Sequence, residues 1–215
     1  MSSSRFPGKM LAPLLQRPLI THVLDRAATV ASVNKVALLT SCDATDDPLA
    51  LYVQRSLEVE VFRGDLENVA RRFQQYLLHA PCEWFVRISG DSPAIDPELV
   101  DLLISHAGDG LDLVTNLAER TFPPGQSVEV LKTSTFLELD VDSLTRDERE
   151  HVTLHYYHHR EKYRTLNVRS RDPDVAQRRL VVDTVDDLKY VSDVLTSNPG
   201  LTRGYAELAK PDDHD

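Results

Sequence analysis

The sequence predicts an α/β fold, in which one domain contains a mostly parallel β-sheet with helices on both of its faces. Short apolar runs rich in strand-forming residues alternate with amphipathic stretches whose apolar residues recur every three or four positions. A chain of 215 residues can bury one sizeable core, and no internal repeat or low-complexity linker divides it. We therefore expect residues 1–215 to form a single domain.

The order of elements follows from local sequence signals. Asp96 is suited to cap a helix that has Pro97 at its first position, and Thr184 with Asp187 resembles a capping box at the start of the last helix. The expected strands are residues 35–40, 57–62, 83–88, 111–115 and 178–184, and the expected helices are residues 17–31, 67–80, 96–107 and 185–197. The segment from about Thr133 to Arg171 is polar, rich in His and Tyr, and lacks this alternation, so we expect it to form a small inserted lobe.

Composition excludes several classes of protein. The formal net charge is −10, with 24 basic and 34 acidic residues, which argues against a nucleic-acid-binding surface but permits one basic loop for a nucleotide. No apolar run approaches the ~18 residues that a membrane-spanning helix needs. Cys42 and Cys82 lie in different expected elements, and we interpret them as free thiols of a cytoplasmic protein.

Polar residues follow each expected strand, and in open parallel sheets ligands bind beyond the carboxyl ends of the strands. Asp91 and Asp183 each stand at such an end, and one or two carboxylates of this kind suit Mg²⁺ that bridges phosphate oxygens. The opening stretch MSSSRFPGKML resembles a phosphate-holding loop, although it matches neither a Walker A motif nor G-x-G-x-x-G. The alternatives are a solvated tail for the loop and turn or cap roles for the two aspartates.

Two other patterns suggest metal chemistry. Asp140 and Asp142 form a D-x-D pattern of the kind that sugar-nucleotide glycosyltransferases use, although an acidic chain of this length yields it by chance. The stretch HVTLHYYHHR brings together His151, His155, His158 and His159, and a pair four residues apart suits zinc. No Cys assists and H-E-x-x-H is absent, so for this stretch we favour a partly exposed aromatic helical surface.

Seven stretches, in order along nearly the whole chain, are similar to motifs of the cytidylyltransferases of the spore-coat polysaccharide type. These enzymes are relatives of the acylneuraminate and 3-deoxy-manno-octulosonate (KDO) cytidylyltransferases. The stretches are SSRFPGKML, PLITHVLDR, VFRGDLENVARRF, VRISGDSPAIDPELVD, RTFPPGQSVEV, REHVT and RLVVDTVDDL. The resemblance implies a nucleotide-diphospho-sugar transferase (Rossmann-like) fold. It also implies transfer of CMP from CTP to a sugar hydroxyl, with release of pyrophosphate, in surface-polysaccharide biosynthesis.

The resemblance also implies roles for individual residues. The loop would hold the CTP triphosphate, with Arg5 and Lys9 as its cations, and Mg²⁺ would be held by Asp91 and Asp183. Arg5, Lys9 and Asp91 would be the catalytic residues, and the lobe would mediate a homodimer. The further nucleotide contacts are Ser3, Ser4 and Thr40, and the contacts to the sugar acceptor are Arg87, Arg120, Glu129 and His151.

The chain departs from the motifs at several positions. Gln126 and Ser127 stand where Leu and Asp are usual, and the apolar strand that precedes the loop is missing, since Met1 falls on the motif's own Met. We expect the 215-residue form to be a shortened enzyme that is poorly soluble or inactive, and a longer form to fold and use CTP. The alternatives are a glycosyltransferase that uses Asp140 and Asp142, or a non-catalytic remnant.

Overall fold

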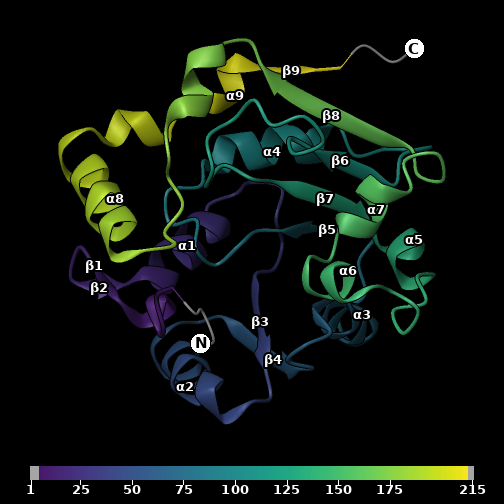
Figure 1. The fold of residues 1–215 in the computed structure, drawn as a ribbon, viewed down its shortest axis with the longest axis horizontal. Helices are drawn as coiled ribbons and strands as arrows, with labels where there is room; N and C mark the ends of the chain where they lie inside the picture. The colour runs from purple at the N-terminus through teal and green to yellow at the C-terminus, as the bar shows by residue number, and fades with distance from the viewer. Residues whose placement is uncertain (1–4, 213–215) are drawn as a thin grey trace.

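The computed structural model describes residues 5–212 and confirms an α/β fold. A five-stranded sheet has the order β5-β7-β6-β8-β9, while β3 pairs with β4 and β1 pairs with β2 in separate two-stranded sheets (Figure 1). The strands are β1 Pro13–Leu14, β2 Arg17–Pro18, β3 Ala37–Ser41, β4 Glu60–Gly64, β5 Trp84–Arg87, β6 Leu113–Thr115, β7 Glu129–Lys132, β8 Thr165–Ser170 and β9 Ala209–Pro211. The helices are α1 Leu19–Ala28, α2 Asp47–Ser56, α3 Val69–His79, α4 Pro97–Ser105, α5 Thr133–Leu137, α6 Arg146–Glu150, α7 Leu154–His158, α8 Val185–Ser197 and α9 Tyr205–Leu208.

The five-stranded sheet contains both parallel and antiparallel pairs of strands, so the expectation of a mostly parallel sheet is wrong for it. Strand β7 runs antiparallel to both of its neighbours, β5 and β6, and β9 runs antiparallel to β8. Strands β5, β6 and β8 nevertheless share one direction, because β6 is parallel to β8 and both β5 and β6 oppose β7. The difference arises because the sequence analysis did not identify β7, which enters between two parallel strands.

Residues 178–184 do not form the strand that was expected. The segment is extended, and its apolar residues Leu180 and Val182 are fully buried, but its amides bond to loops. The Leu180 amide donates to the Pro124 carbonyl at 2.7 Å, and the Val182 amide donates to the Asp91 carbonyl at 2.9 Å. Burial of alternate residues gives this segment the sequence pattern of a strand, although its backbone amides donate hydrogen bonds to loops and not to a neighbouring strand.

The helix-start predictions are confirmed. The Asp96 carboxylate accepts from the Glu98 amide at 3.1 Å, and α4 begins at Pro97. Thr184 and Asp187 form a reciprocal capping box, and α8 spans the residues that the sequence predicted.

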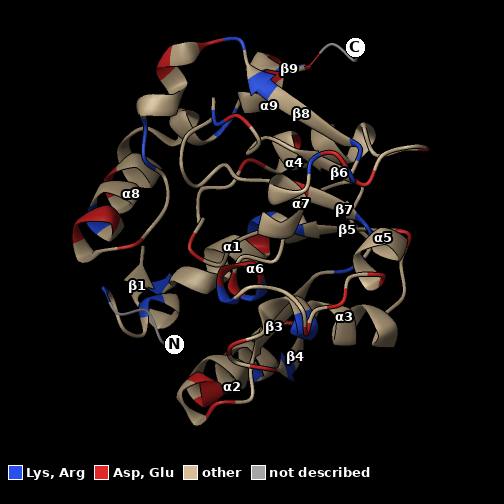
Figure 2. Cartoon of the chain, turned by 45° about the vertical axis from the view of Figure 1, so that its right-hand side comes forward, with Lys and Arg blue, Asp and Glu red and all other residues tan. Residues whose placement is uncertain are grey.

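The inserted lobe is smaller than residues 133–171. Helices α5, α6 and α7 form it, whereas Thr165–Ser170 is β8, which pairs with β6 inside the main sheet. Helix α2 is a further element that the sequence analysis did not identify. Acidic and basic residues are interspersed over the described elements (Figure 2).

A cavity of about 1200 Å³ separates the two-stranded β3–β4 sheet from β5. Consecutive residues line this cavity, 35–40 on one side and 84–90 on the other. Because successive side chains of a strand point to opposite faces, this lining shows that β3 and β5 each present an edge, and not one face, to the cavity. Within residues 5–212, β3 pairs only with β4 and β5 pairs only with β7. No helix in this part of the chain is long and apolar enough to cross a membrane.

Candidate active site

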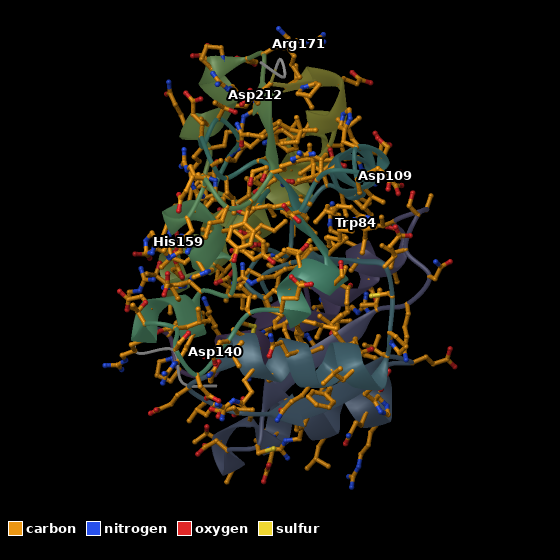
Figure 3. All side chains as sticks on the ribbon, turned by 90° about the vertical axis from the view of Figure 1, so that its right-hand side faces the viewer. Trp84, Asp109, Asp140, His159, Arg171 and Asp212 are labelled. Carbon is orange, nitrogen blue, oxygen red and sulfur yellow. The ribbon has the colours of Figure 1, made fainter. Side chains whose placement is uncertain are left out.

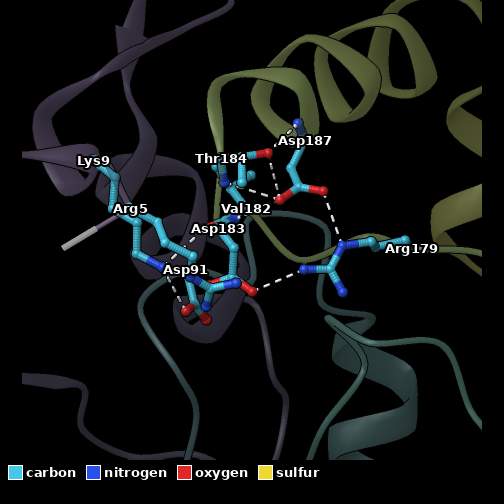
Figure 4. A network of polar contacts seen from close by, with 8 residues as sticks. All are labelled: Arg5, Lys9, Asp91, Arg179, Val182, Asp183, Thr184 and Asp187. Carbon is cyan, nitrogen blue, oxygen red and sulfur yellow. Dashed lines mark hydrogen bonds and ion pairs between the residues drawn. The ribbon is translucent and has the colours of Figure 1, made fainter. Parts of the chain in front are cut away.

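The Lys9 side chain joins three segments that are far apart in the sequence (Figure 4). Its ammonium Nζ donates to Asp91 Oδ2 at 2.8 Å, to the Val182 carbonyl at 2.8 Å and to Asp183 Oδ1 at 3.2 Å. The Lys9 side chain is 8% exposed, and the two carboxylates are 19% and 20% exposed. A nearly buried cation therefore lies between two partly exposed carboxylates.

Local structure positions each member of this cluster. Gly8 has φ 74°, and this left-handed conformation, which favours glycine, turns the chain into the short 3₁₀ helix Lys9–Leu11. The Asp183 amide donates to Asp187 Oδ2 at 3.0 Å, so the N-terminal cap of α8 also holds Asp183. The Val182 amide bonds to the Asp91 carbonyl, which aligns the two carboxylate-bearing segments.

Two arginines add positive charge beside Asp183. Arg5 lies 3.2 Å from Asp183 Oδ1, and Arg179 donates to Asp183 Oδ2 at 2.8 Å. Partial burial raises the pKa of Asp183, but the hydrogen bond and charge of Lys9, together with the two arginines, outweigh this effect and lower it overall. Asp183 is consequently a carboxylate at neutral pH.

The chemistry of these side chains fits the Mg²⁺ predicted from the sequence. Two carboxylate oxygens and one carbonyl oxygen already converge on a single cation, the Lys9 ammonium. Hard oxygen ligands are the kind that Mg²⁺ prefers, with water and phosphate oxygens completing its shell. Asp91 and Asp183 are therefore the residues that would hold this ion.

Gln126 supports the Asp91 loop, a role that the sequence analysis did not assign. Its buried amide Nε2 donates to the Ala94 carbonyl at 2.7 Å, and its Oε1 accepts from the Asp96 amide at 2.8 Å. Asp96 Oδ2 in turn accepts from the Tyr205 amide at 3.0 Å, and burial raises the pKa of Asp96. The only signal in the sequence was that Gln126 departs from the Leu of the motif.

Arg87 and Glu129, both predicted as contacts to the sugar acceptor, form a second charged group. They are cross-strand partners on β5 and β7, and Arg87 Nη1 lies 2.6 Å from Glu129 Oε2. Glu129 is 2% exposed and also accepts from the hydroxyls of Thr153 and Tyr157. Burial and the Glu129 charge raise the pKa of Tyr157, so its hydroxyl remains a donor.

The cavity lies beside both groups. Met10 and Gly90, the chain neighbours of Lys9 and Asp91, line it together with Arg87. Thr40 also lines the cavity, but its hydroxyl donates to Asp46 Oδ2 at 2.6 Å and is already paired. The predicted contact of Thr40 with the nucleotide would therefore use atoms of Thr40 other than this hydroxyl.

The structure does not bring the remaining predicted residues into these groups. Arg120 is exposed between β6 and β7, and His151 is exposed at the end of α6. Within residues 5–212, Glu129 accepts hydrogen bonds from Arg87, Thr153 and Tyr157, and not from Arg120 or His151. Ser3 and Ser4 lie outside the described residues.

The D-x-D residues have local roles. Asp140 Oδ1 accepts from the Asp142 amide at 3.1 Å, which closes a turn, and Asp142 forms an ion pair with Arg71 of α3. Figure 3 shows Asp140 on the outside of the molecule. Cys42 and Cys82 are both exposed free thiols.

The fold and this arrangement of cations and carboxylates define an α/β nucleotidyltransferase. The model of the cytidylyltransferase family matches residues 1–207, and the chain belongs to that family. It is 31% identical over 198 residues to the spore coat polysaccharide biosynthesis protein SpsF of Bacillus subtilis, covering 89% of this chain and 81% of SpsF. It is 38% identical over 119 residues to the 3-deoxy-manno-octulosonate cytidylyltransferase of Nitratidesulfovibrio vulgaris strain DP4, covering 54% of this chain and 46% of that protein.

Solved structures agree with this assignment. A cytidylyltransferase from Leptospira borgpetersenii superposes with a TM-score of 0.87 at 26% identity, covering 97% of this chain and 88% of that one. A CMP:2-keto-3-deoxy-manno-octonic acid synthetase complexed with CTP superposes with a TM-score of 0.65 at 19% identity, covering 90% and 93% of the two chains. The second similarity supports the fold alone.

Proposed function

We propose that this protein transfers CMP from CTP to a hydroxyl of a small sugar. The sugar oxygen attacks the α-phosphorus, the bond from that phosphorus to the α–β bridging oxygen breaks, and pyrophosphate leaves with the electron pair. The hydroxyl proton passes to solvent or a nearby base. The observation that carries the proposal is the convergence of Lys9, Asp91 and Asp183, beside residues Met10 and Gly90 that line the cavity.

The residues would divide the work as follows. Arg5 and Lys9 hold the triphosphate, with Ser3 and Ser4 as further contacts, and Lys9 exchanges a carboxylate for a phosphate oxygen when CTP binds. Asp91 and Asp183 hold Mg²⁺, which when bound neutralises charge on the triphosphate. Such transfers depend on alignment and charge neutralisation more than on a covalent nucleophile.

Arg87 and Glu129 would bind the acceptor sugar. Glu129 is fixed by three donors, so its geometry is preorganised, while Arg87 is 24% exposed. Arg120 and His151 remain predicted acceptor contacts. The printed names of the relatives concern spore-coat polysaccharide and 3-deoxy-manno-octulosonate, which supports an acceptor from surface-polysaccharide biosynthesis.

We also propose that an apolar strand from a longer form of the polypeptide fills the cavity between β3 and β5. Both strands present an edge to it, and its volume exceeds the about 300–1,000 Å³ of ordinary small-molecule pockets. Met10 lines the cavity, so the loop around Lys9 lies next to one end of such a strand. A homodimer through the lobe and a cytoplasmic location also remain predictions.

The direct test is a screen for pyrophosphate release. CTP, and separately the other nucleoside triphosphates, would be incubated with Mg²⁺ and a panel of acidic and neutral sugars. Pyrophosphate formation that requires CTP, a sugar and intact Asp183 supports the proposal. Release of a nucleotide from a sugar nucleotide would instead support a glycosyltransferase, and no turnover by any form of the protein would support a non-catalytic remnant.

A further inference from the structure

Helices α6 and α7 bring a buried carboxylate to a group of histidines. Glu148 is on α6, His155 is on α7, and His159 follows the end of α7. One ligand atom from each of these three residues lies within 4.8 Å of the other two. His159 is at the surface on the outer side of the molecule (Figure 3), so an ion from solvent has access to the group.

The two oxygens of the Glu148 carboxylate have different hydrogen-bond partners. Its Oε2 accepts from the amide and the hydroxyl of Thr145, which completes the capping box of α6. Its Oε1 faces the imidazoles instead, 3.3 Å from His155 Nδ1 and 3.1 Å from His158 Nδ1. The helix cap therefore uses one oxygen and leaves the other directed at nitrogen ligands.

These separations match those between ligands of a zinc ion. Two atoms bound at about 2.0–2.1 Å to a tetrahedral Zn²⁺ lie roughly 3.3–3.4 Å apart. The distance from Glu148 Oε1 to His155 Nδ1 is already 3.3 Å, and a His159 ring nitrogen lies within 4.8 Å of the ligand atoms of both residues. The rings of His155 and His159 are tilted by 50° to each other, and their centroids lie 4.3 Å apart.

The donor types are also suitable. The cluster offers one carboxylate oxygen and ring nitrogens of two histidines. A carboxylate with neutral imidazoles is a donor set that suits Zn²⁺ and not Mg²⁺.

We propose that Glu148, His155 and His159 form a Zn²⁺-binding site that joins α6 to α7. A water molecule would complete the shell of the ion, while His158 hydrogen-bonds to the same carboxylate oxygen. This site is separate from the Asp91 and Asp183 carboxylates and uses different ligand chemistry. Helix α7 also carries Tyr157, whose hydroxyl donates to Glu129 at 2.9 Å, so the ion would stabilise the helix that supports the acceptor side.

The test is a titration of the full chain with Zn²⁺ against a chromophoric chelator, in millimolar Mg²⁺ to occupy the carboxylate site. We expect one equivalent to bind, and His159→Gln to weaken binding by at least about 100-fold, since even outer-shell changes cost 10–100-fold. His159→Cys restores a zinc ligand and should recover much of the affinity. The matched control is His106→Gln, which replaces a histidine at the end of α4 and should leave binding unchanged.

The exposed thiols need a separate control. Cys42→Ser and Cys82→Ser together should leave the stoichiometry at one. Co²⁺ in place of Zn²⁺ should give the visible absorption of a tetrahedral site in the wild type and lose it in His159→Gln. Binding that is absent in the wild type, that survives His159→Gln, or that disappears with the two thiols would overturn the proposal.

Discussion

Replacement of Lys9 by Met would test the centre of the candidate site. Met nearly preserves the volume of the side chain but removes the ammonium that contacts Asp91 and Asp183 at 2.8 and 3.2 Å. Breaking a buried ion pair by removal of one partner costs about 3–5 kcal/mol. Because the carboxylates are about a fifth exposed and water screens them, we expect the lower end, about 3 kcal/mol of unfolding free energy.

The loss should be visible in thermal and chemical denaturation. For a chain of this size, about 3 kcal/mol corresponds to a fall in Tm of roughly 6–12 °C. The matched control is Arg179→Ala, which removes a cation from the same Asp183 but at a side chain that is 45% exposed. Exposed ion pairs contribute about 0–1 kcal/mol, so the control should lose far less stability.

The pH dependence gives an independent check. The pKa of Asp183 is lowered in the folded protein, so its stabilising contribution is present above the unfolded value of 3.8 and is lost as pH falls through the folded value. Without Lys9 this pKa rises, so the stability gap between wild type and Lys9→Met should be full at pH 7 and narrow below about pH 4. Equal stability of Lys9→Met and Arg179→Ala, or a gap independent of pH, would refute the reasoning.

Three other changes test the site and the sheet. Asp183→Asn should lower turnover on the order of 10²-fold at saturating Mg²⁺ with little change in fold by circular dichroism, and near-normal turnover would remove it from the metal site. Gly125 has φ +99°, and Gly125→Ala places a Cβ 2.4 Å from the Leu180 carbonyl carbon, so urea denaturation should show a loss of about 3 kcal/mol or more of unfolding free energy. The control Gly200→Ala adds a Cβ that meets nothing within 4 Å, so its unfolding free energy should be nearly unchanged. A longer form that adds an apolar strand should protect β3 and β5 amides from hydrogen exchange and raise Tm, and a 215-residue form that is already stable and active would contradict this.

Local interactions made much of the fold predictable. Helix α8 has the bounds that its periodicity and the capping box of Thr184 predicted, and α4 begins at Pro97 after its Asp96 cap. These signals depend on residues a few positions apart, which a sequence displays directly. The short strand β7 gave no comparable signal, because a strand of four residues, three of them buried in succession, has too little periodicity to distinguish it from a loop.

The Arg87–Glu129 pair shows that strand register decides which predicted residues meet. Arg87 and Glu129 were both predicted from the resemblance, but only the pairing of β5 with β7 places them opposite each other. Arg120 and His151 came from the same resemblance and are exposed, and in the described chain neither forms a hydrogen bond with that pair. Side chains on loops are positioned by packing, which a motif alone does not specify.

The sequence by itself determined the helices α1, α3, α4 and α8, the strands β3, β4, β5 and β6, the family resemblance and the identity of the charged residues in the opening loop. Only the tertiary structure decided that Lys9 lies between Asp91 and Asp183, and that Glu148 joins the histidines of α7. The physical reason is separation along the chain: Lys9 and Asp183 are 174 residues apart, and no local propensity specifies such a contact. It forms because burial of the intervening elements in a common core brings their polar ends to one place.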